Sequence, residues 1–213
     1  APGHHKIHDA YTFLPNGMPL IPVEATKGAL CIVRNPLDVA ISFANHNSSS
    51  IDQSIGHMAD STYSFCAKSG RLFNQLRQQL LSWSEHVTSW VDAPDINKHL
   101  VRYEDMQQSP METFTQIATF LELPNDKQAI STALAHCKME NLQAQEALSP
   151  FREKAANTDT FFRKGIVGDW QQTLTAAQIN QVIDDHREVM ARFGYLNEHG
   201  QPSTLISLKT PTA

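Results

Sequence analysis

The sequence predicts an α/β fold in which a parallel sheet is flanked by helices. Two short, continuous apolar runs, at residues 29–33 and 99–103, are typical of buried parallel strands. Long helical patterns lie between and after these runs, as the crossover connections of parallel strands require. The chain of 213 residues is long enough for one substantial core. We therefore expect a single domain over residues 1–197, followed by a polar C-terminal tail over residues 198–213.

In the first part of the chain, prolines and caps define the expected elements. The first 27 residues hold four prolines and fit an extended or looped segment. After the first strand, Asn35 fits a helix N-cap and Pro36 fits the first helical position. A short helix is expected over residues 51–60. Apolar residues spaced by three and four predict a long amphipathic helix over residues 72–91.

The second part of the chain adds three helices after the second strand. A Ser-x-x-Glu capping box predicts one helix over residues 109–121. A second helical pattern covers residues 126–147, and residues 149–169 are irregular. The last helix is expected over residues 175–194. It begins with a Thr-x-x-Gln capping box and ends at a glycine. Because a stable parallel sheet usually has more than two strands, we expect strands to be missing from this chain.

Net charge and composition limit the binding partners and the cellular compartment that we expect for this protein. The net charge of −5 argues against a nucleic-acid coat and against an anionic membrane surface, so we expect neither partner. No apolar run is long enough to span a bilayer, and the N-terminus lacks the apolar core of a signal peptide. The three cysteines form no C-x-x-C pair, which indicates reduced, cytoplasmic thiols rather than a disulfide framework or a zinc knuckle.

The junction after the first strand is the first candidate site. Arg34 ends the strand at its carboxyl end, where open α/β sheets bind ligands. The helix that follows offers free N–H groups, and Ser42 lies about six residues into it. One phosphate could accept a forked pair of hydrogen bonds from Arg34 and one hydrogen bond from Ser42. The alternative is a structural pair between Arg34 and Asp38, with Ser42 facing water.

A second basic segment reads "FFRKGIVGDW", residues 161–170. Arg163 and Lys164 are adjacent, and Gly165 lets the main chain approach a ligand closely. The pattern fits an anion clamp, and it fits a solvated basic turn equally well.

The N-terminal stretch "HHKIHDA" supplies a candidate general base. The pKa of a histidine such as His8 lies near working pH, and Lys6 shares its face in an extended segment. A metal-binding histidine cluster is an alternative, but no carboxylate or cysteine stands at a zinc spacing, and we expect no metal. A fortuitous surface cluster is the plainest alternative. Tyr103 ends the second strand near the expected place of Arg34, either as a base-contacting residue or as a core tyrosine.

Together these stretches resemble one family. "KIH", "IVRNPLDVAISFANH", "LVRYEDM" and "FFRKGIVGDW" are similar, in this order, to motifs of the soluble sulfotransferases that use 3′-phosphoadenosine 5′-phosphosulfate (PAPS), particularly the bacterial branch. The resemblance runs from about Lys6 to about Leu196. It implies a P-loop sulfotransferase-like fold, PAPS as co-substrate, a small-molecule hydroxyl acceptor and no metal.

The resemblance implies a role for each matching residue. Arg34 and Ser42 match residues that bind the 3′-phosphate of PAPS, and Tyr103 matches a tyrosine near the adenine. His8 matches the base that takes the proton from the acceptor hydroxyl, and Lys6 matches a lysine close to the transferring sulfuryl group. The other matches form the second phosphate clamp, the aromatic pair before it and an adenine contact: Arg163, Lys164 and Gly165, Phe161 and Phe162, and Met139.

The sequence departs from the family at the sulfuryl-donor end. No glycine-rich strand–helix junction precedes Lys6, whereas the family has a phosphate-binding loop with a catalytic lysine there. We therefore expect the chain to be N-terminally incomplete and inactive by itself. The usual Lys-Thr-His reads Lys-Ile-His here. Near the C-terminus, Gln171 and Asn180 replace the charged ends of the animal dimer motif, which leaves the oligomeric state open.

Three functions agree with these observations. The first is a PAPS-dependent sulfotransferase, in which alignment and charge neutralisation support in-line transfer. The second is a catalytically incomplete chain that only binds a 3′-phosphorylated adenine nucleotide. The third is a nucleoside or nucleotide kinase of the related P-loop class. Residues 9–24 and 47–70 are the expected contributors to an acceptor pocket.

Overall fold

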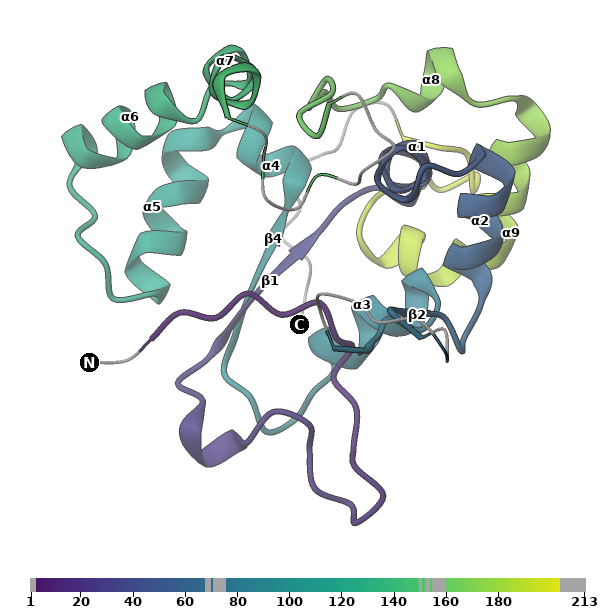
Figure 1. Ribbon diagram of the computed structural model, residues 1–213, viewed down its shortest axis with the longest axis horizontal. Coiled ribbons are helices and arrows are strands. Elements are labelled where there is room, and N and C mark those ends of the chain that lie inside the picture. The colour runs from purple at the N-terminus through teal and green to yellow at the C-terminus, as the bar shows by residue number, and fades with distance from the viewer. Residues whose placement is uncertain are drawn as a thin grey trace.

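Two parallel strands form the centre of the molecule in the computed structural model, which describes residues 3–67, 70, 76–149, 151, 154 and 160–203. Strand β1 (Ala29–Val33) pairs with β4 (Lys98–Arg102) over their full length. Helices flank this sheet on both sides (Figure 1), which confirms the predicted α/β class. A 3-10 helix, η1 (Val23–Ala25), precedes β1.

The helices form two groups, one on each side of the sheet (Figure 1). The first group contains five helices: α1 (Pro36–Asn47), α2 (Ile51–Ala59), α3 (Trp83–Val91), α8 (Trp170–Thr173) and α9 (Ala176–Arg192). The second group contains four: α4 (Tyr103–Gln108), α5 (Pro110–Phe120), α6 (Lys127–His136) and α7 (Met139–Leu148). The N-terminal segment crosses in front of the sheet between the two groups (Figure 1).

The main core lies on the side of the first group. Leu37 and Ala40 of α1 are fully buried, as are Val182 and Met190 of α9. Helices α1 and α9 begin for the predicted reasons, whereas the capping box of α2 was not predicted. The Asn35 side chain accepts a hydrogen bond from the main-chain N–H of residue 37, with Pro36 at the first helical position, and capping boxes start α2 and α9.

The predicted helix over residues 72–91 is too long: of its described residues, 76–91, only the last nine are helical. Helix α3 covers only Trp83–Val91, and Gln78–Gln79 form strand β3, which pairs with β2 (Ser64–Phe65). Leu81 has a left-handed φ of 62°, which interrupts a helix, and the next residue begins α3 with a capping box. Residues 71–75 lie outside the described part of the chain.

Three further expectations need correction. The predicted helix over 126–147 is two helices, because Lys138 is extended (φ −59°, ψ 141°) and separates α6 from α7. The Ser109 side chain makes no cap hydrogen bond, although α5 does begin at Pro110. The second strand ends at Arg102, so Tyr103 opens α4 instead of ending the strand.

The described part of the predicted C-terminal tail folds back on the domain. Leu196 bridges to Pro202, and Ser203 donates its main-chain N–H to the carbonyl of Tyr195 at 2.9 Å. The remaining tail residues, 204–213, lie outside the described residues. Among the helices that the structure describes, none combines the length and the apolar composition needed to span a bilayer.

A buried histidine on α9 makes the stability of this fold dependent on pH. His186 is 2% exposed, its Nδ1 lies 2.9 Å from the Ser84 hydroxyl, and burial lowers its pKa to about 4. An unfolded histidine has a pKa of about 6.5, so between these values the unfolded state holds a proton that the folded state lacks. The free energy of unfolding should therefore fall by about 2 kcal/mol between pH 7 and pH 5 through this residue.

Urea unfolding of the wild type and of His186→Gln at both pH values measures this effect. The glutamine variant cannot titrate, so its free energy of unfolding should fall less than that of the wild type, by about 2 kcal/mol. An equal fall in both proteins would show that His186 does not carry the pH dependence.

Candidate functional site

A large pocket of about 980 Å³ opens where β1 and β4 end. Parallel strands place their carboxyl ends at one edge of the sheet, so Arg34 and Tyr103 meet there. The N-terminal segment, α1, the β2–β3 pair, α7 and the segment 161–165 complete the walls. All eleven residues predicted for the site line this pocket: Lys6, His8, Arg34, Ser42, Tyr103, Met139, Phe161, Phe162, Arg163, Lys164 and Gly165.

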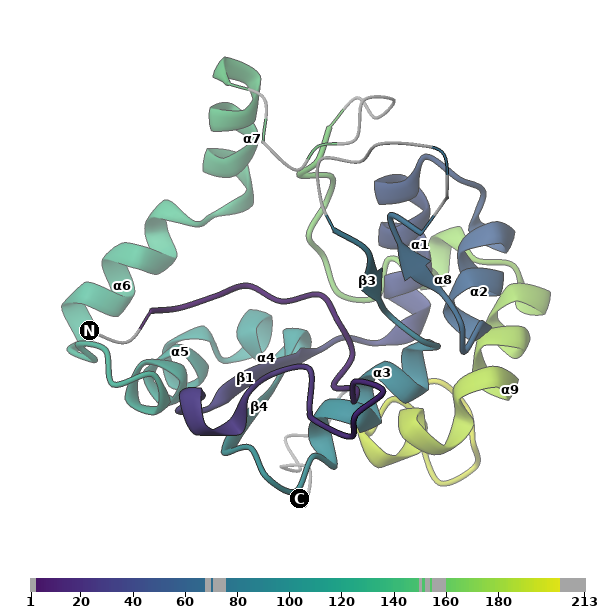
Figure 2. The ribbon, with the colours of Figure 1, turned by 60° about the horizontal axis from the view of Figure 1, so that its bottom comes forward.

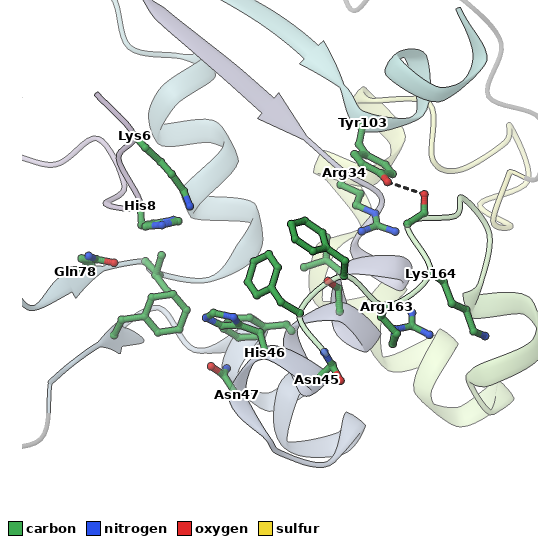
Figure 3. A pocket seen from close by; sticks show the side chains of 18 of the residues that line it. Lys6, His8, Arg34, Asn45, His46, Asn47, Gln78, Tyr103, Arg163 and Lys164 are labelled. Carbon is green, nitrogen blue, oxygen red and sulfur yellow. Dashed lines mark hydrogen bonds between the residues drawn. The ribbon is translucent and has the colours of Figure 1, made fainter. Parts of the chain in front are cut away.

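Arg34 lines this pocket beside Tyr103, on the same side as Arg163 and Lys164 (Figure 3). Its guanidinium carbon is 4.3 Å from the centroid of the Tyr103 ring, and its Nη2 donates to the carbonyl of Ile166 at 3.0 Å. Among the described residues, no acceptor bonds its buried Nε. Buried polar groups normally have partners, so this orphaned N–H marks a place where an acceptor from a ligand would fit.

The alternative pairing of Arg34 with Asp38 is not formed. The Asp38 carboxylate, 1% exposed, accepts instead from the main-chain N–H groups of Gly168 at 2.8 Å and Trp170 at 3.1 Å. This buried carboxylate thereby fastens α1 to the basic segment 161–170. Ser42, about one turn further along α1 than Asp38, is exposed at the pocket wall.

Tyr103 joins the second strand to the same basic segment. Its hydroxyl donates to the carbonyl of Gly165 at 2.7 Å, as the dashed line in Figure 3 shows. Gly165 has a φ of 62°, and a Cβ there would collide with Cε of Met139. The left-handed main-chain conformation favours glycine at this position, and a larger residue would also have to displace the flexible end of Met139.

The two cations of the expected anion clamp, Arg163 and Lys164, are both paired with one buried carboxylate. Asp169 accepts from Arg163 Nη2 at 2.6 Å and from Lys164 Nζ at 2.7 Å. Burial by itself would raise the pKa of Asp169, but the hydrogen bonds from Lys164 and Arg163 outweigh it and hold the pKa below its ordinary value. Both cations line the pocket while ion-paired, so a bound anion would have to share them with Asp169.

Lys6 and His8 approach the pocket from the side opposite Arg163 and Lys164 (Figure 3). The residue after His8 is tethered. Asp9 accepts the N–H of Gln79 on Oδ1 at 2.8 Å and the indole N–H of Trp90 on its carbonyl at 2.9 Å. His8 is thus held on the side of the pocket across from the basic segment. Among the described residues there is no group of three or more His, Cys, Asp or Glu side chains suited to a metal ion.

Part of the pocket wall is aromatic. Phe65 lies 5.7 Å from Phe43 and 5.8 Å from His46, measured between ring centroids. Residues 47–70 contribute Asn47, Phe65 and Cys66 to the pocket, as expected, whereas its described lining includes none of residues 9–24. Aromatic faces in a pocket favour contact with a planar, apolar group.

A model of the sulfotransferase domain matches residues 24–194, most of the chain. The chain belongs to the sulfotransferase domain family. Rat (Rattus norvegicus) sulfotransferase 1A1 is 26% identical over 192 residues, which cover 87% of this chain and 62% of the relative. Mouse (Mus musculus) sulfotransferase 1B1 is 30% identical over 115 residues, which cover 52% of this chain but only 38% of the relative. This member of the family is thus aligned with only part of each relative.

Solved structures show the same fold. The crystal structure of mouse sulfotransferase SULT7A1 complexed with PAP matches with a TM-score of 0.60 and 21% identity, covering 84% of this chain and 63% of that one. Retinol dehydratase in complex with androsterone and inactive cofactor PAP matches with a TM-score of 0.62 and 20% identity, covering 84% and 51%. The sulfotransferase-like α/β fold is therefore established for this chain.

Sequence reasoning missed several residues that build this sulfotransferase pocket. The sequence suggested Asp38 as an alternative partner of Arg34, whereas its carboxylate joins α1 to the basic segment. Gln143 and Glu146 of α7 bond the main chain of the basic segment, and no hydrophobic pattern on that exposed helix distinguishes them. Phe65 reaches the pocket from a strand of two residues, too short for a periodic signal.

Replacement of Asp38 by asparagine should destabilise this sulfotransferase domain. An amide can accept from one of the two buried N–H groups but turns a donor toward the other, so the free energy of unfolding should fall by about 2–3 kcal/mol. Urea unfolding measures the change. Asp184→Asn, at an exposed ion pair with Arg187, is the control and should cost less than about 1 kcal/mol. Equal small effects would show that the Asp38 link does not stabilise the domain.

Proposed function

We propose that this chain carries the 3′-phosphate site and the acceptor-side base of a PAPS-dependent sulfotransferase that acts on a hydroxyl of a small molecule. The single observation that carries the proposal is Arg34, whose buried Nε has no partner among the described residues and which faces a pocket that also holds His8. A forked guanidinium beside a hydroxyl and a second basic segment is a donor set suited to a phosphate monoester. The cofactor therefore fits the residues present.

The residues divide into a binding end and a reacting end. At the binding end, Arg34 and Ser42 would hold the 3′-phosphate from α1, and the segment from Arg163 to Gly165 would hold it from the other wall. Tyr103 and Met139 would contact the adenine. These are the same roles that the family resemblance implies, and the shared pocket supports them.

At the reacting end, His8 would take the proton from the acceptor hydroxyl as its oxygen bonds to sulfur. PAPS supplies the activated sulfuryl group when it is bound. The electron pair of the broken S–O bond leaves on the phosphate of adenosine 3′,5′-bisphosphate, and the Lys6 ammonium would stabilise that charge. In this proposal His8 accepts the proton of the acceptor hydroxyl directly, and no step uses a metal ion.

The lining of the pocket limits the class of acceptor. Lysines, arginines, histidines, amides and aromatic rings line its described walls, without an aspartate or a glutamate. A protonated amine would find no counter-charge there, so we propose a neutral hydroxyl compound with an apolar ring. One relative is an amine sulfotransferase from Oryctolagus cuniculus, 25% identical over 171 residues, so the distinction is worth testing.

A second candidate is a chain that only binds the nucleotide. These 213 residues contain no G-x-x-x-x-G-K-[ST] sequence, which favours it. The cytoplasmic location that we propose is supported by three cysteines that are all free. The bacterial branch and the domain boundaries at residues 1–197 stay predictions.

A transfer assay distinguishes the two candidates. The complete gene product and this chain are each given radiolabelled PAPS with a panel of phenols, aliphatic alcohols and primary amines. We expect label transfer to phenols by the complete product and little or none to amines. If the complete product binds adenosine 3′,5′-bisphosphate tightly but transfers no label, the sulfotransferase proposal is wrong and the nucleotide-binding function is favoured.

A further inference from the structure

Helix α7 contacts the basic segment through one stripe of side chains. The helix buries none of its own residues, and with α6 it extends from α5 away from the sheet (Figure 2). Met139, Gln143 and Glu146 are spaced by four and three, so they share one face of the helix. Met139 lines the pocket against Gly165, and the other two bond main-chain groups of residues 161–163, up to the first residue of the clamp.

Gln143 and Glu146 make four hydrogen bonds to three consecutive residues. Gln143 Nε2 donates to the carbonyls of Phe162 at 3.0 Å and Arg163 at 2.8 Å. Glu146 accepts the N–H of Phe161 on Oε1 at 2.7 Å and the N–H of Phe162 on Oε2 at 3.1 Å. These N–H bonds, that of Phe161 first, hold the pKa of the Glu146 carboxyl below its ordinary value, so it is charged at neutral pH. A donor and an acceptor from one helix thus fix the peptide groups that lead into Arg163.

The segment 161–170 is therefore fastened at both ends, with the clamp between. Asp38 holds the far end from within the core, through Gly168 and Trp170. At the near end, α7 supplies the four hydrogen bonds to residues 161–163 from side chains outside the core, and Asn45 of α1 adds one weaker bond, donating to the Thr160 carbonyl at 3.4 Å. The loss of the α7 contacts should consequently loosen the clamp without unfolding the domain.

We infer that Gln143 and Glu146 are positioning residues for the 3′-phosphate: they fix the main chain that presents Arg163, Lys164 and Gly165 to the pocket. The inference rests on the proposed function, in which residues 163–165 bind the 3′-phosphate of the nucleotide. Affinity for the 3′-phosphate should depend on both side chains, whereas the stability of the core should not. Because both act on the same residues, the double variant should be little worse than the stronger single variant.

Two measurements on the full 213-residue chain test the inference. Hydrogen exchange followed by mass spectrometry reports whether the peptide covering residues 161–165 is held. Calorimetric titration with adenosine 3′,5′-bisphosphate and with adenosine 5′-monophosphate reports the contribution of the 3′-phosphate alone. The variants are Gln143→Ala and Glu146→Gln, and their matched controls on other faces of α7 are Gln145→Ala and Glu140→Gln, at exposed positions.

We expect the two variants, and neither control, to speed exchange in residues 161–165. They should weaken bisphosphate binding by about 10-fold or more, change monophosphate binding less than about 3-fold, and keep the thermal midpoint of the wild type. If both variants show the exchange rates and the bisphosphate affinity of the wild type, this inference is wrong, while the proposed function is unaffected. Equal loss of both nucleotides with a lowered thermal midpoint would also overturn it, because the role would then be structural. A wild type that binds the two nucleotides equally would instead refute the proposed function, and this inference with it.

Discussion

Replacement of His8 by alanine is expected to lower the rate of sulfuryl transfer by about 10²- to 10⁴-fold in the complete gene product. His8 is the general base proposed for the acceptor hydroxyl, and an alanine leaves that proton with no positioned acceptor. The affinity for adenosine 3′,5′-bisphosphate should change little, because Arg34 and the clamp lie on the opposite side of the pocket. Initial rates with labelled PAPS, together with calorimetric titration of the bisphosphate, measure the two quantities separately.

His5→Ala is the matched control for this variant. His5 belongs to the same N-terminal segment and is exposed, and it is not among the residues that line the pocket. Its rate should equal that of the wild type. A normal rate in the His8 variant would show that another group takes the proton, and a normal His8 rate with a slow His5 variant would move the base to His5.

Replacement of Arg34 by alanine is expected to weaken binding of adenosine 3′,5′-bisphosphate by about 2–4 kcal/mol, or about 30- to 700-fold. The guanidinium is placed by its contact with the Tyr103 ring and by its bond to the Ile166 carbonyl, which leaves Nε for a ligand. Arg34→Lys should recover only part of the affinity, since an ammonium cannot make the forked pair. Calorimetric titration measures the affinity.

The control for Arg34 is Arg187→Ala, which removes one positive charge from an exposed ion pair on α9. Its affinity for the bisphosphate should stay within about 2-fold of the wild type, because a distant surface charge is screened. If the Arg34 variant binds like the wild type, the assignment of the 3′-phosphate to this residue is wrong.

Hydrophobic periodicity and capping residues correctly predicted the helices whose starts are marked in the local sequence. Asn35, with a proline after it, starts α1 as expected, and the Thr175 capping box starts α9. The same rules failed over residues 72–91, where leucines at helical spacing do not form one helix. Leu80 lines the pocket from a non-helical segment, and the left-handed Leu81 ends any continuation. Tertiary contacts fix that segment, since Gln79 bonds Asp9 and Ala10 from the far end of the chain.

The site could be predicted where its residues stand next to a strand end or in a family-like motif. Arg34, Tyr103 and the clamp residues belong to that class, and the fold brings them together in one pocket. The supports behind them could not be predicted. Asp38 bonds Gly168, which lies 130 positions further along the sequence, and Gln143 and Glu146 bond main-chain atoms that carry no sequence signature. A residue that bonds a backbone is recognised only when the backbone path is known.

The most direct test of the central claim is the nucleotide preference of the wild-type chain. Calorimetric titration with adenosine 3′,5′-bisphosphate, adenosine 5′-monophosphate and ATP compares ligands that share the adenosine but differ in their phosphates. A site built on Arg34, Ser42 and the clamp should bind the 3′-phosphorylated nucleotide at least about 10-fold more tightly than either of the others. An equal or higher affinity for ATP would contradict recognition of the 3′-phosphate and would favour a kinase-like site instead.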